Sequence, residues 1–552
     1  MSLSSFGFNK SRRFESEIRF FVLASVALVC ANAQPSTADT VRFLEEATFG
    51  PNSALIAHVQ SIGFAAFLQE QFAATASSYP SLPLYPTTVP TTCTGTCVLD
   101  NYTMYPLQVT FFTNALTAQD QLRQRVAFAL QQIMVASGLA ITQPSWMTPY
   151  LQIFSADAFG NFRTLLGNIT LNPAMGEYLN MAGNNKTAPN ENYGREVLQL
   201  FSVGLNLLNQ DGSLMTDAQG NPIPTYTQPT VDAFSRVFTG WNLQAAKTSP
   251  APCSSTTTCP DYIDPMTVTP GNHDSGAKTL FNGLTIPALT PVTVASANAE
   301  LNTALDNIFN HPNVGPFIAR NLIEHLVTSN PSAGYISRVA GVFNNDGTGA
   351  RGNLQAVVQQ ILLDPEARTS PVSFLSGHLQ EPVLFIARLL RAFNTTSATT
   401  DFVLSDSYLP SGLQMGEDLF RSPSVFNYYP PSYPVVVSGF HVNGPEFSIQ
   451  STSTALARIN FVAEVAYHTM PISSPNRPTG TWLDLSAFTP LAANPPQLIA
   501  ALNSLLLHGQ ASSTLLSSVS NALASMSGAS NLALTQRAVY LFASSPEYFI
   551  ER

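Results

Sequence analysis

The sequence predicts a mainly α-helical fold: a large multi-helix globular body with a small β-hairpin and long surface loops. Apolar residues recur at helical spacing along most of the chain, strand-like alternation is sparse, and stretches rich in Pro, Thr and Ser separate the helical segments. The 552 residues suffice for about two or three domains, but no charged or low-complexity linker divides them. We therefore expect a single helical body over residues 34–552.

Residues 1–33 have the order of a secretory signal peptide. Basic residues come first, the apolar run Phe20 to Val29 follows, and Ala31-Asn32-Ala33 precedes Gln34. A twin-arginine signal at Arg12-Arg13 is less favoured, because two glutamates follow where that signal prefers apolar residues. No run in the chain reaches the roughly 18 apolar residues of a transmembrane helix. We expect cleavage after Ala33 and an exported protein, periplasmic or extracellular, without a permanent membrane span.

Several segments carry the apolar stripe that one face of a buried helix presents. In residues 354–362 the apolar positions fall at i, i+3, i+4, i+7 and i+8. The stripes are Leu122, Val126, Leu130 and Ile133; Leu301, Leu305, Ile308 and Phe309; Val314, Phe317, Ile318, Leu322 and His325; and Leu354, Val357, Val358, Ile361 and Leu362. The expected surface loops between helices are Ser78 to Asn101, Ala246 to Asn272, Asn394 to Gly412 and Met470 to Pro496.

A small hairpin is expected around residue 270. Met266 to Thr269 alternates apolar and polar residues, His273 to Gly276 supplies turn residues, and Lys278 to Phe281 follows. We expect the first and last of these segments to pair.

The four cysteines of the mature chain fall in two close pairs, Cys93 with Cys97 and Cys253 with Cys259. We expect two local disulfides, which fit an oxidising compartment. Cross-pairing between the two loops stays open, because four cysteines permit three connectivities. A metal-thiolate cluster is disfavoured, because neither spacing is C-x-x-C.

The charge pattern excludes nucleic acid as an expected partner. The net charge of −10 becomes −12 when the signal, with four basic and two acidic side chains, is removed, and Lys186, Lys247 and Lys278 are then the remaining lysines. Charged residues make up 11% of the chain, against about 25% in an average soluble domain. The surface must therefore be polar but mostly uncharged, which suits a secreted or carbohydrate-rich setting.

One segment resembles a known family. Pro189 to Glu196 reads PNENYGRE, Leu200 to Gly204 reads LFSVG, and Thr239-Gly240-Trp241 follows further on. These motifs are similar to those of the family catalogued as domain of unknown function 1800, which is found in exported bacterial proteins. The resemblance extends from about Thr40 to the carboxyl terminus, and other matching segments are Arg42 to Gly50, His273 to Lys278 and Pro423 to Phe426.

The resemblance implies an exported protein whose activity is not established. Because family members are often encoded beside another exported family, it also implies a co-exported protein partner. Many relatives carry Trp-His-Asn-His after the Arg-x-Arg helix, where this chain reads Ala129-Leu130-Gln131-Gln132. A metal role of those histidines therefore does not transfer to this chain.

The segment after Asn190 is the first candidate site. Asn190 can cap a helix on which Glu191 and Arg195, or Asn192 and Glu196, share a face at i, i+4. In the structural interpretation, Glu191 and Arg195 pair on the surface and Glu196 anchors a neighbouring loop. In the functional interpretation, Glu191 and Glu196 act as general acid and base or as metal ligands. Five residues span about 140° of helix rotation, so one ion would need further ligands.

The predicted turn is the second candidate site. Histidine is the side chain whose ordinary pKa lies near neutrality, Asp274 can orient or charge the neighbouring His273, and Lys278 lies four residues on. In the structural interpretation Asp274 forms an Asx turn and His273 is exposed. We expect any site to lie between the helix near Glu191, the segment from Arg236 to Trp241, and this turn. Arg236, Trp241 and Asn192 are its binding candidates.

Other familiar sites are not expected. The loops 209–221 and 344–353 are rich in oxygen ligands, but the second has Gln355 where a calcium-binding loop has a bidentate glutamate, so turn chemistry explains them better. The G-x-S-x-G, H-E-x-x-H and G-x-G-x-x-G motifs are absent, and no cofactor is expected. His311 and His325 are expected to be structural.

Two functions remain. The first is a scaffold or binding protein that acts with a co-exported partner, favoured by the lack of a complete catalytic motif. The alternative is an exported hydrolase of a polar polymer, a polysaccharide or a peptide, with Glu196 and His273/Asp274 as acid-base groups. The clustering of charged residues in a charge-poor chain favours the alternative.

Overall fold

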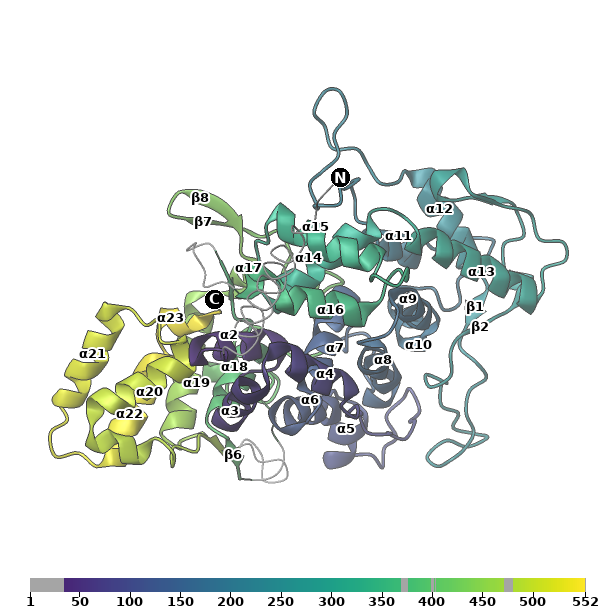
Figure 1. Ribbon diagram of the computed structural model, residues 1–552. Coiled ribbons are helices and arrows are strands. Elements are labelled where there is room, and N and C mark those ends of the chain that lie inside the picture. Colours follow the sequence, from purple (N-terminus) through teal and green to yellow (C-terminus); the bar gives the residue numbers. More distant parts are fainter. Residues whose placement is uncertain (1–33, 369–375, 399–401, 403, 471–479, 552) are drawn as a thin grey trace, which may run out of the picture.

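The computed structural model describes residues 34–368, 376–398, 402, 404–470 and 480–551. Residues 1–33, the predicted signal peptide, lie outside this part of the chain. The described residues form a mainly helical structure with two-stranded antiparallel sheets (Figure 1). The prediction of a mainly α fold with small β elements is confirmed. No helix in the described ranges is both long and apolar enough to cross a membrane.

The first helices form the centre and one lower side of the molecule in Figure 1. Side-chain caps begin several of them: Ser36 accepts a hydrogen bond from the backbone of Asp39, and Asn52 accepts one from that of Leu55. The helices are α2 (Thr37–Ala47), α3 (Ser53–Ile62), α4 (Phe64–Ala73), α5 (Thr96–Asn101), α6 (Tyr105–Thr117), α7 (Gln121–Ile133), α8 (Pro144–Asp157), α9 (Phe162–Leu171) and α10 (Pro173–Tyr178).

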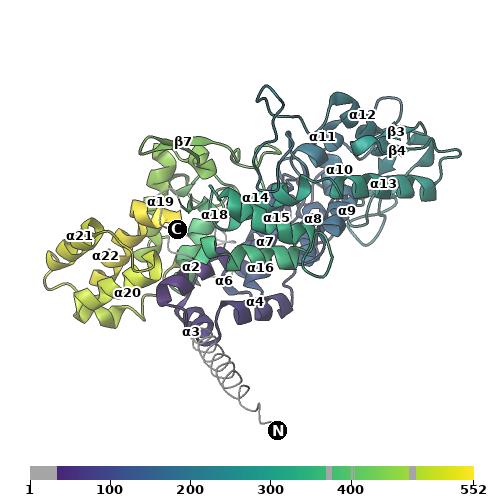
Figure 2. The ribbon, with the colours of Figure 1, turned by 45° about the horizontal axis from the view of Figure 1, so that its top comes forward.

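In the middle of the chain, α11, α12 and α13 lie toward the opposite end from the carboxyl-terminal helices, whereas α14, α15 and α16 lie nearer the centre (Figures 1 and 2). Its helices are α11 (Asn192–Gln199), α12 (Gln228–Val237), α13 (Val294–Phe309), α14 (Val314–Leu326), α15 (Ala333–Asn344), α16 (Leu354–Leu363) and α17 (Pro365–Arg368). Its short elements are β1 (Trp241–Asn242), β2 (Thr267–Val268), η1 (Pro270–Asn272), β3 (Lys278–Thr279), η2 (Phe281–Gly283) and β4 (Thr285–Ile286).

The last third supplies one end of the molecule, where α20, α21 and α22 lie together (Figures 1 and 2). Its helices are α18 (Pro382–Ala392), α19 (Thr452–Ala466), α20 (Pro495–Leu507), α21 (Ser513–Ala524), α22 (Asn531–Ala543) and α23 (Pro546–Phe549). Its other elements are β5 (His378–Leu379), β6 (Thr396–Ser397), η3 (Ser411–Leu413), β7 (Pro434–Val437), β8 (Phe440–Asn443), η4 (Pro445–Ile449), β9 (Thr481–Trp482), η5 (Thr489–Ala493) and β10 (Ile550–Glu551).

The predicted apolar stripes are buried as expected. In α16 all five stripe residues are inaccessible to solvent, and α7 buries its four. In α14, Val314, Ile318 and Leu322 are buried, whereas Phe317 and His325 are only half-buried. The spacing of apolar residues therefore identified which helix faces form the core. The exception is α14, whose stripe residues Phe317 and His325 line a pocket.

A buried ionic contact joins the start and the end of the chain. Glu45 on α2 pairs with Arg388 on α18 at 2.5 Å and with His508, which follows α20, at 2.7 Å. The carboxylate is buried, so these partners offset its desolvation. The contact links α2 to α18 and to the residue that follows α20.

The predicted hairpin between Met266 to Thr269 and Lys278 to Phe281 is wrong. Both segments contain strands, but β2 pairs with β1, with Trp241 opposite Val268, and β3 pairs with β4, with Lys278 opposite Ile286. Tertiary contacts decide the pairing, because the turn packs inward against Gly240. A Cβ on Gly240 would lie 2.9 Å from the backbone nitrogen of His273, so only glycine allows this approach.

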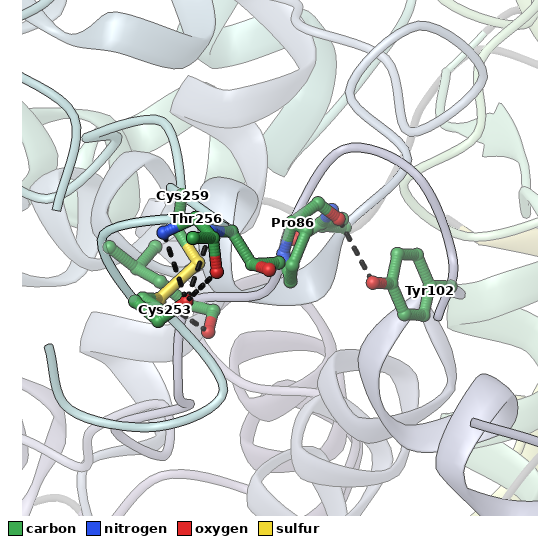
Figure 3. The surroundings of a disulfide bond; sticks show 9 residues. Pro86, Tyr102, Cys253, Thr256 and Cys259 are labelled. Carbon is green, nitrogen blue, oxygen red and sulfur yellow. Dashed lines mark hydrogen bonds between the residues drawn. A yellow bond between two sulfur atoms is a disulfide. The ribbon is translucent and has the colours of Figure 1, made fainter. Parts of the chain in front are cut away.

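Both predicted disulfides are present, Cys93–Cys97 and Cys253–Cys259. The two loops are neighbours: Cys253 Sγ lies 3.4 Å from the Leu84 carbonyl oxygen, and Figure 3 shows the second disulfide beside Pro86, whose carbonyl accepts a hydrogen bond from Tyr102. The loops thus pack together without cross-pairing. Within the expected loop from Ser78 to Asn101, the last six residues form the short helix α5.

Candidate functional site

Helix α11 presents the first predicted group on the surface. Arg195 Nη2 and Glu191 Oε2 are 2.7 Å apart, and both side chains are more than a third exposed. Gln228 of α12 bridges the pair, because it accepts from Arg195 at 3.1 Å and donates to Glu191 at 3.0 Å. These hydrogen bonds lower the pKa of Glu191. The arrangement matches the structural interpretation, a surface pair that fixes α11 to α12.

Glu196 lies on the other side of α11 and is half-buried. Its Oε2 atom is buried without a hydrogen-bond partner, and Tyr178 and Tyr226 are close enough to feel its charge. Burial raises the pKa of Glu196, and the neighbouring Arg195 offsets part of the rise. Asn192 is exposed and donates to Asn180. Gly194 allows the close packing of α11 on α12, since a Cβ there would lie 2.7 Å from Ser235 Oγ.

The second predicted group forms a closed ionic cluster. Lys278 Nζ is 2.8 Å from Glu300 Oε1, and both side chains are fully buried. The same ammonium group donates to the carbonyls of Asp274 and Gly276, at 2.8 and 3.0 Å. Arg236 of α12 pairs with Asp274 at 2.7 Å, and Asp274 has a lowered pKa because this arginine and the Gly276 amide contact it. The ammonium group of Lys278 is thus surrounded by oxygen atoms of the protein.

His273 and Trp241 are buried beside this cluster, contrary to the exposed histidine of the structural interpretation. His273 Nδ1 lies 2.7 Å from the Thr239 carbonyl oxygen, and Nε2 lies 3.3 Å from Glu300 Oε1. The imidazole has no solvent exposure. The Trp241 indole is 1% exposed and donates to the Val237 carbonyl. Both side chains are thus enclosed by protein atoms.

The structure therefore brings Arg236, His273, Asp274 and Lys278 together. It places Glu191, Arg195 and Glu196 in a separate group on α11. In the ranges that the structure describes, no hydrogen bond or ion pair links the two groups. Glu300, which the sequence did not single out, is the carboxylate that the turn requires.

A pocket lies elsewhere, with a cavity volume of about 430 Å³. Its walls are α14, the loop that follows α11, the end of α7, and the segment from Val425 to Glu446. Phe317, Leu205, Phe426 and Pro430 supply apolar surface. The polar residues of the lining are Gln132, Gln199, Asn206, Arg320, Asn321, Glu324, His325, Asn427, Tyr429, Ser432, Asn443 and Glu446.

The floor of the pocket is a hydrogen-bonded network. Gln132 of α7 donates to Glu381 Oε1 at 2.9 Å, and the Tyr429 hydroxyl donates to Glu381 Oε2 at 2.5 Å. Asn427 donates to Gln132 Oε1 at 3.3 Å and has φ of 64°, a left-handed conformation that asparagine tolerates. Each of these side chains is less than a tenth exposed. The polar side chains of the floor are thus held in place by hydrogen bonds to one another.

Two glutamates on the walls have raised pKa values. Burial raises the pKa of Glu324 on α14 to about 8, with an opposing effect of Arg320 and a further rise from the charge of Glu446. Burial also raises the pKa of Glu446 on η4 to about 7, and His378 partly opposes the rise. Beside them, burial and the positive charge of Arg125 lower the pKa of His325 to about 3. At neutral pH the imidazole is therefore uncharged.

Asn313 holds the loop that forms one wall. Its Nδ2 group donates to the carbonyls of Val203 and Asn206, at 2.9 and 2.8 Å, and its Oδ1 accepts from the Leu208 amide at 3.0 Å. The side chain is 1% exposed. One amide thus satisfies three backbone groups of a loop whose β pairing consists of isolated bridges.

Sequence reasoning missed this pocket. The apolar periodicity placed His325 on a helix stripe as a structural residue, and no sequence pattern marked Glu324 or Glu446 as a candidate. A usable indication was that a Glu-His pair stands beside the apolar stripe of a helix in a charge-poor chain. Two segments quoted for the family resemblance, Leu200 to Gly204 and Pro423 to Phe426, also contribute to the lining.

The comparisons with known proteins give one result. A family model described as "Protein of unknown function (DUF1800)" matches residues 42–550, nearly the whole chain. No curated protein and no solved structure matches the chain. Among the described residues, no group of three or more His, Cys, Asp or Glu side chains is placed to hold a metal ion.

Proposed function

Because the chain belongs to the DUF1800 family, whose description names no activity, we propose a function from its own residues. It is an exported binding protein, and the pocket beside α14 binds an uncharged polar ligand with apolar surface, such as part of a polysaccharide or a peptide. Export rests on the signal pattern of residues 1–33 and agrees with the two disulfides.

The lining of the pocket is the observation that carries this proposal. It combines aromatic and proline surface with amide side chains, a composition typical of sites for neutral, hydroxyl-bearing or amide-bearing ligands. Its one arginine, Arg320, already donates to the Gly212 carbonyl at 2.9 Å. Because burial raises the pKa of Glu324 to about 8 and that of Glu446 to about 7, these carboxyl groups carry less negative charge near neutral pH than ordinary glutamates, and their protonated forms donate hydrogen bonds. A strongly charged ligand would find no matching partner.

A partner protein fits the surface next to the pocket. The hairpin of β7 and β8 stands out from the body in Figure 1, and Val436 and Phe440 on it are 63% and 56% exposed. Exposed apolar side chains on a projecting hairpin are typical of protein contacts. We propose that a co-exported partner binds there, which retains the scaffold function alongside ligand binding.

The alternative of a hydrolase with Glu196 and His273/Asp274 as acid-base groups has less support. A general base must reach a substrate proton, and His273 is enclosed between Thr239 and Glu300. Glu196 keeps an unpartnered, half-buried carboxyl group and remains the stronger member of that pair.

Titration calorimetry on the mature protein tests the binding proposal, with neutral oligosaccharides and uncharged peptides as probes. Phe426 lines the pocket and is 46% exposed. We expect Phe426→Ala to weaken the affinity about tenfold. Leu284→Ala is the matched control, because Leu284 is 40% exposed and lies outside the pocket lining. Absence of binding by every probe, or equal affinities for wild type and Phe426→Ala, would contradict the proposal.

A further inference from the structure

The hairpin of β7 and β8 projects from the body next to the pocket (Figure 1). Its base belongs to the pocket, because Asn443 and Pro445 are among the lining residues. A two-stranded hairpin on its own is only marginally stable in water, and a third strand stabilises it. A third strand beside this hairpin would lie next to the pocket.

The pairing of the two strands shows which backbone groups point outward. Gly444 donates to the Tyr433 carbonyl oxygen at 2.9 Å, so these two residues are hydrogen-bonded across the hairpin. Hydrogen-bonded pairs and pairs with outward backbone groups alternate along antiparallel strands. In the observed register the outward pairs are Pro434 with Asn443 and Val436 with His441. The backbone groups of these residues therefore lie along the two edges of the sheet.

At Asn443 a side chain already occupies the β8 edge. The Asn330 amide donates to the Asn443 carbonyl oxygen at 2.8 Å and accepts from the Asn443 N–H at 2.9 Å. One side-chain amide thus makes the two hydrogen bonds that a residue of a neighbouring strand would make. The next outward groups on this edge, those of His441, lie about 7 Å further along the strand. No other described residue outside the hairpin forms a hydrogen bond with them.

The β7 edge is less suited to pairing than the β8 edge. Pro434 has no N–H group, and proline is one of the residues that protect exposed sheet edges from other chains. Charged side chains are another such protection, but residues 422–445 contain no Asp, Glu, Lys or Arg. β8 itself contains neither proline nor a charged side chain. The β8 edge is therefore open to an added strand.

The side chains of the hairpin indicate what such a strand would carry. Val435, Val437, Phe440 and Val442 share one face of the sheet, because residues two apart on a strand and residues directly opposite point the same way. A strand added to β8 extends this apolar face, so apolar side chains at alternate positions suit it. A charged side chain of the partner would find no counter-ion on the hairpin.

We propose that β8 accepts an extended, uncharged segment of a partner protein as a third strand, paired with the backbone of His441. This inference rests on the partner-binding surface of the proposed function and states how the partner is held. Main-chain hydrogen bonds supply affinity, and alternate apolar side chains supply specificity. The added strand ends where Asn330 occupies the edge, so the partner chain leaves the hairpin beside Asn443 and the pocket.

The probe is the uncharged heptapeptide acetyl-TVTVTVT-amide with a neutral fluorophore, and fluorescence anisotropy follows its binding to the mature protein. Two further copies carry N-methyl groups, one on its valines and the other on its threonines. Because alternate N–H groups of a strand point to opposite edges, one methylated copy should lose at least about tenfold in affinity. The other should bind like the parent peptide.

A variant of the edge gives the matching test on the protein. His441→Pro removes the outward N–H and should weaken binding of the parent peptide about tenfold or more. Pro434 stands at an equivalent outward position, which shows that the hairpin tolerates proline there. His441→Ala keeps the N–H group and is the matched control, with an affinity within about threefold of the wild type.

Equal affinities of the three peptides would show docking through side chains, which overturns strand addition but leaves the hairpin as the partner site. Binding that Phe426→Ala abolishes and His441→Pro does not would place the peptide in the pocket and also overturn the inference. A wild-type dimer in sedimentation that His441→Pro dissociates would assign the edge to a second copy of this chain instead. Failure of the wild type to bind the parent peptide overturns strand addition, whereas the calorimetry with oligosaccharides decides separately on the pocket.

Discussion

Lys278 and Glu300 form an ion pair of 2.8 Å in which neither side chain is exposed to solvent. The lysine belongs to β3 and the glutamate to α13, so the pair fixes the His273 turn to a helix more than twenty residues away in the sequence. Breaking a buried pair by removing one partner costs about 3 to 5 kcal/mol, because the remaining charge is left without compensation.

We expect Lys278→Met to lower the free energy of unfolding by about 3 to 5 kcal/mol, as measured by urea denaturation. Glu300 would then be buried without its ammonium partner, with the His273 imidazole 3.3 Å away. Arg195→Ala is the control, because it removes an exposed pair with Glu191 that should contribute less than about 1 kcal/mol. Equal effects of the two substitutions would show that the cluster is not the structural anchor described here.

Glu446→Gln should change how stability depends on pH. The pKa of Glu446 in the folded protein, about 7, lies above its ordinary value of 4.5, so the folded state binds this proton more tightly. Its contribution to stability is full below pH 4.5 and is lost as the pH rises through 7. Glutamine does not titrate, so the variant should gain stability over the wild type across this window, by about 1 to 3 kcal/mol at pH 8.

The measurement is a set of urea unfolding curves for both proteins from pH 4.5 to 8.5. Glu324 and His378 titrate in overlapping ranges and interact with the charge of Glu446, so the difference between the curves reports the titration of Glu446 together with its effect on these two neighbours. A difference that does not vary with pH would contradict the assignment.

Reduction of the disulfides should loosen two loops without unfolding the body. The bridged cysteines are four and six residues apart, so each disulfide closes a short loop and contributes at most about 2 kcal/mol. We expect a reducing agent to lower the melting temperature by a few degrees and to leave the helical circular dichroism unchanged. Loss of helical signal on reduction at 25 °C would show that the loops around Cys93 and Cys253 organise the helices.

The helices could be predicted because their evidence is local. The stripe from Leu354 to Leu362 lies within three turns, and the periodicity states which face is buried whatever the neighbours are. The strand partners could not be predicted in this way. β2 pairs with β1 across more than twenty residues, and the pairing depends on how Gly240 receives His273.

The candidate site was also harder to predict from the sequence, because its residues are distant from one another along the chain. Lysine is rarely fully buried, and the distant partner Glu300 explains the burial of Lys278. The pocket residues Gln132, Glu324 and Glu446 are separated by more than a hundred positions along the chain. None belongs to a motif with a fixed spacing, so their convergence becomes visible only in three dimensions.

The start of the mature protein is a direct test of export. Mass spectrometry of protein secreted by a host with a general export pathway should find Gln34 at the amino terminus, because cleavage is expected after Ala33. Secretion should fail when residues 1–33 are deleted. A secreted product that retains these residues would remove the basis for the proposed export.

Asn313→Ala tests whether one side chain organises the pocket wall. The substitution leaves the Val203 and Asn206 carbonyls and the Leu208 amide without their partner, and each buried unpaired group costs about 1 to 3 kcal/mol unless water reaches it. We expect a loss of about 2 to 4 kcal/mol in unfolding free energy, together with faster amide hydrogen exchange in residues 203–208. Asn321→Ala is the control, since Asn321 also lines the pocket but donates only within α14, to the Phe317 carbonyl. If both variants exchange at the wild-type rate in this loop, the wall is held by other contacts, and ligand affinity should then be insensitive to Asn313. If Asn313→Ala alone loosens the loop and weakens ligand binding, the pocket depends on a wall that this amide keeps in place.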